Sequence, residues 1–164
     1  MNFANILKND IADSDRGMCV SLWFQGCEIK CPGCQNFFLW DPNAGKQVDN
    51  DLIVETILEA LDKNDIHRNL SILGGEPLAE FNKKDCNYIL SAIRKARPSL
   101  YIILWTGYYY EDLKNRNDKD IQNILNLIDV LVDGPYVEKL RDVTLKLRGS
   151  PNQRVLRLKN GMIE

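Results

Sequence analysis

Several features are scarce or missing in this chain of 164 residues, and each absence argues against a class of protein. No apolar run approaches the roughly 20 residues that a helix needs to cross a bilayer, so we expect no membrane partner. The amino terminus lacks a basic stretch followed by an apolar core, which predicts a cytoplasmic chain without a secretory signal. Because the formal net charge is only −2, no broad basic surface points to nucleic acid as a partner.

Histidine is almost absent as well. His67 is the only one, and no motif carries paired carboxylates, so the sequence offers little for hydrolysis by general acid–base catalysis. Cysteine, by contrast, occurs 5 times, and most of these residues lie close together. In a cytoplasmic protein such a cluster indicates metal or redox chemistry rather than structural disulfides. Cys19 and Cys86 stand apart from the cluster, and we expect them to pack as small apolar side chains.

The chain as a whole is typical of one α/β domain. Its hydrophobic fraction of 45% is enough for a core, and no repeat or linker divides residues 1–164. Apolar runs and one alternating segment at the carboxyl end predict strands at 20–24, 70–73, 100–105, 129–132 and 153–158. Apolar stripes with helical spacing predict helices at 52–61, 88–96 and 121–128. Asp49 and Asn50 are candidate N-caps of the first helix.

Strands that alternate with helices predict a parallel sheet. The chain is too short for a complete eight-stranded barrel of about 250 residues, so we expect an incomplete (β/α) barrel or a curved, mostly parallel sheet. In both architectures, sites form beyond the carboxyl ends of the strands. Four segments with unusual chemistry follow predicted strands and should meet at one rim, namely the cysteine loop and residues 74–77, 106–107 and 133–134.

The cysteine loop carries Cys27, Cys31 and Cys34. A structural zinc ion is closed by four protein ligands, usually in two pairs, so zinc would need Cys19 or Cys86 to fold back onto the loop. A [4Fe–4S] cluster fits better, because three thiolates can each hold one iron and leave the fourth iron open to a small molecule. An open iron favours catalysis over simple electron transfer.

The C-x3-C-x2-C spacing of these cysteines resembles the signature of the radical S-adenosylmethionine enzymes. Gly74-Gly75-Glu76-Pro77 follows a predicted strand and resembles the segment with which those enzymes bind the methionyl amino group. Alone, this segment would be interpreted as an ordinary turn that leads from a strand into a helix. After the cysteine loop, the resemblance favours the cofactor-binding interpretation.

Further stretches make the resemblance narrower. They are similar to the activating proteins of anaerobic (class III) ribonucleoside-triphosphate reductase, and the likeness covers most of the chain. The stretches are residues 25–27, 31–36, 105–108, 130–134 and 147–154. One segment departs from that group, because Asp15-Arg16-Gly17-Met18-Cys19 stands where the group often has Gly-Pro-Gly-x-Arg. We interpret the group's segment as one that contacts substrate or partner.

The resemblance implies a reaction and its cofactors. A [4Fe–4S] cluster would reduce bound S-adenosylmethionine to methionine and a 5′-deoxyadenosyl radical, and this radical would take a hydrogen atom from a backbone glycine of the reductase. In such enzymes the cofactor supplies the chemistry and the protein supplies binding and orientation. The implied partners are the reductase, which gains a glycyl radical, and a flavodoxin- or ferredoxin-type reductant. A homodimer is left open.

The resemblance also assigns residues. Cys27, Cys31 and Cys34 are the expected iron ligands and catalytic residues. The expected cofactor-binding residues are Gly33, Cys34, Gln35, Gly74, Gly75 and Glu76. Further candidates for contacts with cofactor or partner, for which ordinary turns, edges or half-buried packing are equally good explanations, are Thr106, Asp133, residues 108–110 and residues 152–154.

Two alternatives stay open. The chain could activate another glycyl-radical enzyme of the pyruvate formate-lyase type, although those activators are longer. It could also be a non-enzymatic interaction module that binds zinc with the help of Cys19.

Overall fold

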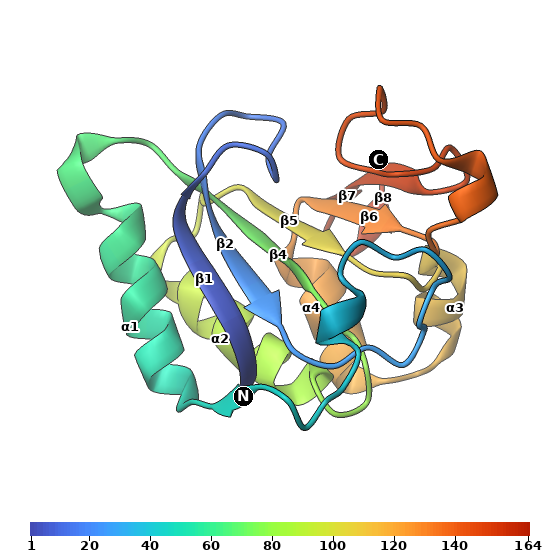
Figure 1. The fold of residues 1–164 in the computed structure, drawn as a ribbon. Coiled ribbons are helices and arrows are strands. Elements are labelled where there is room, and N and C mark those ends of the chain that lie inside the picture. Colours follow the sequence, from blue (N-terminus) through green and yellow to red (C-terminus); the bar gives the residue numbers. More distant parts are fainter.

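Eight strands form one sheet in the order β3-β1-β2-β4-β5-β6-β7-β8 in the computed structural model, which describes residues 1–164 (Figure 1). The strands are β1 Asn2–Asp10, β2 Cys19–Phe24, β3 Lys46–Gln47, β4 Asn69–Gly74, β5 Ile102–Trp105, β6 Val130–Asp133, β7 Arg154–Lys159 and β8 Met162–Ile163. The α-helices are α1 Asn50–Leu61, α2 Lys83–Ala96, α3 Tyr110–Asn115 and α4 Lys119–Leu127. Short 3-10 turns are η1 Phe37–Leu39, η2 Lys63–Asp65 and η3 Glu138–Leu140.

The centre of the sheet is parallel, as the alternation of strands and helices predicts. β2, β4, β5 and β6 pair in parallel, and α1, α2 and α4 lie on one face of the sheet. Parallel neighbours need a crossover of a dozen or more residues, which these helices provide. The predicted strands at 20–24, 70–73, 100–105 and 129–132 and the three predicted helices are therefore confirmed.

The expectation of a mostly parallel sheet is wrong, because only the three central pairings are parallel and the four outer pairings are antiparallel. β1 pairs with β2 and β3, and β7 pairs with β6 and β8, and all of these pairings are antiparallel. The connections at both ends of the chain carry no crossover helix, so the chain returns in the opposite direction. β1 escaped the sequence analysis because its asparagine, lysine and aspartate residues are poor strand formers, and its pairing with β2 outweighs that preference.

The main core lies between the sheet and the helices. Alternate residues of the parallel strands point to this side, among them Leu22, Ile72 and Leu104, and each is fully buried. α2 contributes a buried stripe, and Asp49 caps α1 through its side chain, as predicted. Burying one such Leu or Ile side chain contributes about 1.5–3 kcal/mol. Cys19 and Cys86 are buried and free, as expected for cysteines that pack as apolar residues.

The opposite face of the sheet is covered by two loops instead of helices. The first is the segment 11–18, where the backbone carbonyls of Asp13 and Arg16 accept hydrogen bonds from Ser71 and Asn69. The second follows β6, and its Leu147 carbonyl accepts a hydrogen bond of 2.6 Å from the indole of Trp105. The divergent segment 15–19 thus lies at the amino ends of the parallel strands, away from the rim where a site is expected.

Two neighbouring carboxyl groups, Asp10 at the end of β1 and Asp13 in the first loop, make stability depend on pH. Burial, together with the neighbouring carboxylate of Asp10, raises the pKa of Asp13 to about 7 from 3.8. The pKa of Asp13 is higher in the folded chain than in the unfolded chain. Its contribution to the free energy of unfolding is therefore complete below pH 3.8 and is lost as pH rises through about 7. Asp13→Asn should therefore exceed the wild type in free energy of unfolding by about 1 kcal/mol above neutrality, a value reduced for partial solvent exposure.

Anaerobic urea unfolding at several pH values measures this effect. The difference between Asp13→Asn and the wild type should grow from about pH 4 to about pH 7 and then level off. A difference that is independent of pH would show that Asp13 ionises normally in the folded chain.

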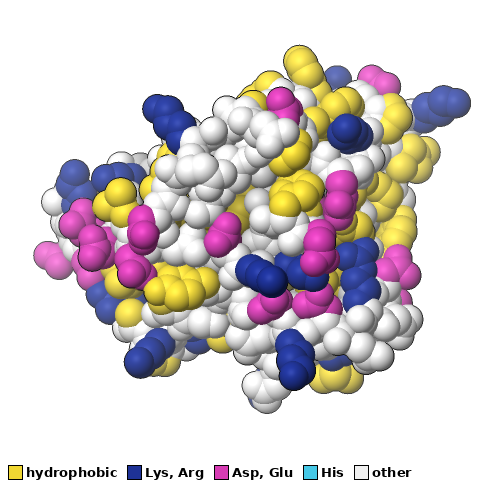
Figure 2. Space-filling view, turned by 90° about the horizontal axis from the view of Figure 1, so that it is seen from below, with side chains coloured by type: hydrophobic (Ala, Val, Ile, Leu, Met, Phe, Trp, Pro, Cys, Tyr) yellow, Lys and Arg dark blue, Asp and Glu magenta, His cyan; other side chains and the backbone are white.

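The surface has no dominant charge. Figure 2 shows dark-blue and magenta side chains intermixed on the face seen from below, with apolar side chains between them. None of the helices combines the length and the apolar character that a membrane span requires.

Candidate active site

The carboxyl ends of the parallel strands meet at one rim, as predicted. Phe24 pairs with Gly74, Leu104 with Ile72 and Trp105 with Val132, so the four strands end at similar levels. An open cavity lies there, and its wall includes residues from all four predicted segments. These are Cys27, Cys31 and Cys34, then Gly74, Gly75 and Glu76, then Thr106 and Gly107, and then Gly134.

Backbone hydrogen bonds hold the cysteine loop against its neighbours. Glu76 donates its backbone N–H to the Gly26 carbonyl at 2.8 Å, and Gly75 donates to the Phe24 carbonyl at 2.8 Å. The fully buried Asn82 donates its amide to the carbonyls of Gln25 at 2.9 Å and Glu76 at 3.0 Å. One buried amide thus joins the cysteine loop to the turn after β4. The role of Asn82 could not be predicted from the sequence, because a single asparagine before a helix is usually an N-cap.

Two glycines let the turn after β4 approach the cysteine loop closely. Gly74 has φ of +113°, which only glycine adopts readily, and a Cβ there would lie 2.5 Å from the Phe24 nitrogen. A Cβ on Gly75 would lie 2.2 Å from the Gly26 carbonyl oxygen. Both glycines are therefore required by packing. The backbone N–H of Gly75 donates to the Phe24 carbonyl, whereas the Gly75 carbonyl accepts no hydrogen bond from the chain.

Glu76 is a buried carboxylate that fastens the next strand end to this turn. It accepts hydrogen bonds from the Thr106 hydroxyl at 2.9 Å and from the backbone N–H groups of Gly107 and Leu78 at 2.8 and 2.9 Å. Burial raises its pKa to about 7, although these three donors favour the charged form and act in the opposite direction. Glu76 itself lines the cavity, and its two oxygens hold Thr106 and Gly107, which line the same cavity.

The three clustered thiols share the cavity and fit a cluster of several irons. Each is half-buried, and burial raises the pKa of Cys27 and of Cys31, so a cation would have to offset the charge when they ionise. No group of three His, Cys, Asp or Glu side chains is arranged to hold one metal ion. In a [4Fe–4S] cube each cysteine binds a different iron, so the thiols need to share a cavity and not a single ion.

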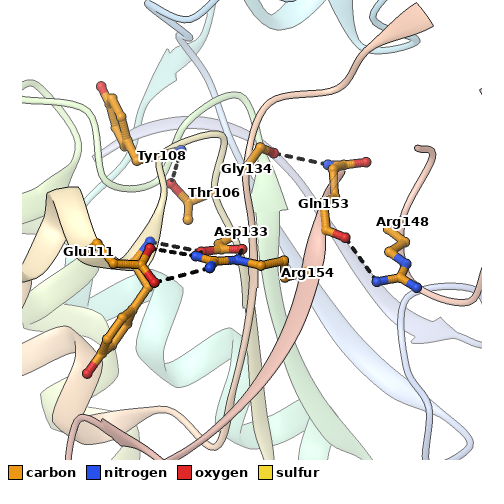
Figure 3. A network of polar contacts seen from close by, with 9 residues as sticks. Thr106, Tyr108, Glu111, Asp133, Gly134, Arg148, Gln153 and Arg154 are labelled. Carbon is orange, nitrogen blue, oxygen red and sulfur yellow. Dashed lines mark hydrogen bonds and ion pairs between the residues drawn. The ribbon is translucent and has the colours of Figure 1, made fainter. Parts of the chain in front are cut away.

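The last part of the rim is fixed by an ionic network between β6, β7 and α3 (Figure 3). Arg154 donates through Nε to the buried Asp133 at 2.9 Å and through its terminal nitrogen to Glu111 at 2.7 Å. Asp133 also accepts the Tyr110 backbone N–H, so its carboxylate is fully engaged. Gln153 donates to the Gly134 carbonyl at 3.2 Å and lines the cavity. Asp133 and Arg154 thus hold the rim in place, while Gln153 reaches the site.

Comparison with known proteins agrees with this geometry. A family model described as a 4Fe-4S single cluster domain matches residues 15–156. Anaerobic ribonucleoside-triphosphate reductase-activating protein from Escherichia coli (strain K12) is 34% identical over 159 residues, which cover 97% of this chain and 100% of that protein. The proteins of the same name from Salmonella typhi and Enterobacteria phage T4 are 36% and 34% identical, over 92% and 94% of this chain and 94% and 93% of their own lengths.

The chain belongs to the family of anaerobic ribonucleoside-triphosphate reductase-activating proteins. The resemblance drawn from its motifs is therefore confirmed at the level of the family.

Two of the expected cofactor-binding residues do not line the cavity. Gly33 and Gln35 are exposed, and a Cβ on Gly33 would lie 2.4 Å from the Glu138 carboxyl carbon, so this glycine accommodates η3. The wall also contains side chains that the sequence analysis did not assign, namely Ile29, Asn36, Trp40, Leu73, Trp105 and Tyr136. For some of them the sequence held an indication, because Leu73 and Trp105 end predicted strands and Ile29 lies between two of the cysteines.

The tyrosines after β5 serve packing. Tyr110 is buried and donates its hydroxyl to the Gly161 carbonyl at 2.9 Å, while Tyr108 donates to Glu28 of the cysteine loop. Burial and the hydrogen bond to Glu28 raise the pKa of Tyr108. The half-buried interpretation therefore describes this segment better than a docking surface.

Proposed function

We propose that this protein is a radical S-adenosylmethionine enzyme that generates a glycyl radical on anaerobic ribonucleoside-triphosphate reductase. The observation that carries the proposal is the shared cavity, because three thiols from one loop and the Gly74–Glu76 turn line it together. Relatives of nearly the same length are named as activators of that reductase. The open sheet, with helices on one face, is compatible with an incomplete barrel of the radical S-adenosylmethionine type.

In this proposal, each part of the wall has a distinct role. Cys27, Cys31 and Cys34 would hold the cluster, and Gly33 and Gln35 would shape the loop beside the third thiol. The Gly75 carbonyl, with its acceptor capacity unused, suits an ammonium group such as that of a methionyl moiety. When bound, the cluster would supply the electron that cleaves S-adenosylmethionine, and the resulting carbon radical would take a hydrogen atom from the target glycine.

The apolar part of the wall protects such chemistry. Leu73, Ile29 and the indole of Trp105 line the cavity beside the thiols. Apolar side chains exclude water from a site, which prevents side reactions of reactive intermediates. The buried carboxylate of Glu76 keeps Thr106 and Gly107 in place in the same cavity wall.

We further propose a cytoplasmic location and a flavodoxin- or ferredoxin-type reductant. The support is chemical, since all cysteines are free thiols and reduced thiols persist in the cytosol.

Glycyl-radical EPR spectroscopy tests the function. The protein is reconstituted with iron and sulfide under strict anaerobiosis, reduced, and mixed with S-adenosylmethionine and the reductase from the same organism. We expect a glycyl-radical signal on the reductase that requires all components. A signal only on another glycyl-radical enzyme would support the pyruvate formate-lyase alternative, and one bound zinc without acid-labile sulfide would support the interaction module.

A further inference from the structure

An apolar groove lies beside the cavity, on the face of the sheet that carries no helices. Its walls come from β1, the end of β2 and the turn η1. The lining residues are Ala4, Asn5, Leu7, Trp23, Asn36, Phe38 and Leu39. Five of these seven are apolar, so the groove would gain from being covered.

The rim of the groove exposes large aromatic side chains. Phe37 and Phe38 are 64% and 62% exposed and pack edge to face, with their ring centroids 6.1 Å apart. Leu7 on the opposite side is 40% exposed. These three side chains contribute nothing to the buried core, although Leu7 lies in β1 and the two phenylalanines lie in η1. Exposed aromatics of this kind mark interaction sites.

The groove is continuous with the cavity. Asn36 lies in the walls of both, two residues after the cysteine Cys34. A molecule bound between Leu7 and Phe38 would therefore extend to the cavity past Asn36. A substrate that reacts in the cavity and is too large to enter it would lie across this groove.

The free edge of β1 indicates a polypeptide occupant. β3 pairs only with Asn2 and Phe3, so the outer edge of β1 has no strand partner from Ala4 onward. An unpaired strand edge presents alternating backbone donors and acceptors, which an extended peptide matches. Ala4, Asn5 and Leu7 belong both to this edge strand and to the groove.

We propose that this groove, between β1 and η1, binds the segment of the reductase that carries the target glycine. The inference rests on the proposed function and adds the surface that presents the glycine to the cavity. An extended segment would lie along β1, insert an apolar side chain between Leu7 and Phe38, and continue past Asn36 toward the thiols.

The test compares Phe38→Ser with Tyr88→Ser in the reconstituted full-length protein. Tyr88 is 49% exposed on α2 and does not line the groove or the cavity, so it is a matched control for losing a surface aromatic. We expect Phe38→Ser to weaken binding to the reductase by about tenfold or more and Tyr88→Ser to leave it within about twofold. Iron content and thermal unfolding of both variants establish that the cluster and the fold are retained.

Hydrogen exchange gives a second measurement that does not depend on a variant. Adding the reductase should slow exchange of the backbone amides of residues 4–10 and 36–39. Protection confined to other surfaces, or unchanged binding by Phe38→Ser, would overturn the docking proposal. If Leu7→Asp converts a dimer of this protein to a monomer without changing reductase binding, the occupant is a second copy and the proposal also fails.

These outcomes are separate from those that decide the proposed function. A wild-type protein that forms no glycyl radical on the reductase contradicts the function itself. A wild-type protein that forms the radical, together with a Phe38→Ser variant that binds the reductase normally, contradicts only the docking surface.

Discussion

Cys31→Ala is expected to abolish S-adenosylmethionine cleavage, with a loss of at least about a thousandfold. Cys31 lies in the middle of the cysteine loop and lines the cavity with Cys27 and Cys34. Its removal would leave two thiols for a cluster that needs three protein ligands in this proposal. The iron bound per chain after reconstitution should fall together with the activity, because metal binding and the folding of its loop are coupled.

Cys86→Ala provides the matched control. Cys86 is fully buried in α2, and burial raises the pKa of its thiol, as expected for an inert packed cysteine. We expect this variant to lose about 1 kcal/mol of stability and to keep its iron and its activity. Anaerobic assays of 5′-deoxyadenosine formation, with iron and sulfide analysis of the same samples, measure both effects. A folded Cys86→Ala protein without activity would require a new assignment of the ligands.

The fold could be predicted where strands are buried on both faces. Residues 70–73 are apolar except for Ser71, and residues 130–132 are apolar throughout, because helices or loops cover both sides of their strands. β1 could not be predicted, since five of its nine residues are polar or charged and its pairing with β2 decides its structure. The antiparallel edges depend on connections without helices, and no local pattern encodes the direction in which a chain returns.

The candidate site also combines residues that a local sequence pattern predicts with residues whose roles depend on distant contacts. The spacing of Cys27, Cys31 and Cys34 is local, so the sequence could predict that these residues act together. Asn82 and Glu76 act through hydrogen bonds to distant backbone groups, which become visible only when the strand ends have converged. The two glycines after β4 were predicted from a resemblance to bind cofactor, and the structure adds a steric requirement of its own.

That steric requirement leads to a large predicted effect at Gly75. A Cβ at this position would lie 2.2 Å from the carbonyl oxygen of Gly26, which is backbone and is held by the Glu76 N–H at 2.8 Å. The new methyl group must therefore move the cysteine loop itself. We expect Gly75→Ala to destabilise the protein by about 3 kcal/mol and to prevent it from retaining iron.

Gly107→Ala separates this effect from the substitution as such. Neither glycine has a positive φ, so alanine is compatible with both backbones, and each lines the same cavity. A Cβ on Gly107 would meet the Cδ1 atom of Ile29 at 2.4 Å, and that atom ends a flexible side chain that can change rotamer. The cost of this movement is partly offset, because replacing glycine by alanine lowers the conformational entropy of the unfolded chain and so stabilises the fold by about 0.4–1 kcal/mol.

We therefore expect Gly107→Ala to stay within about 1 kcal/mol of the wild type and to retain its iron. Urea unfolding and iron analysis of both variants measure the contrast, and equal losses would show that contact with the Gly26 backbone is not what makes glycine necessary at position 75.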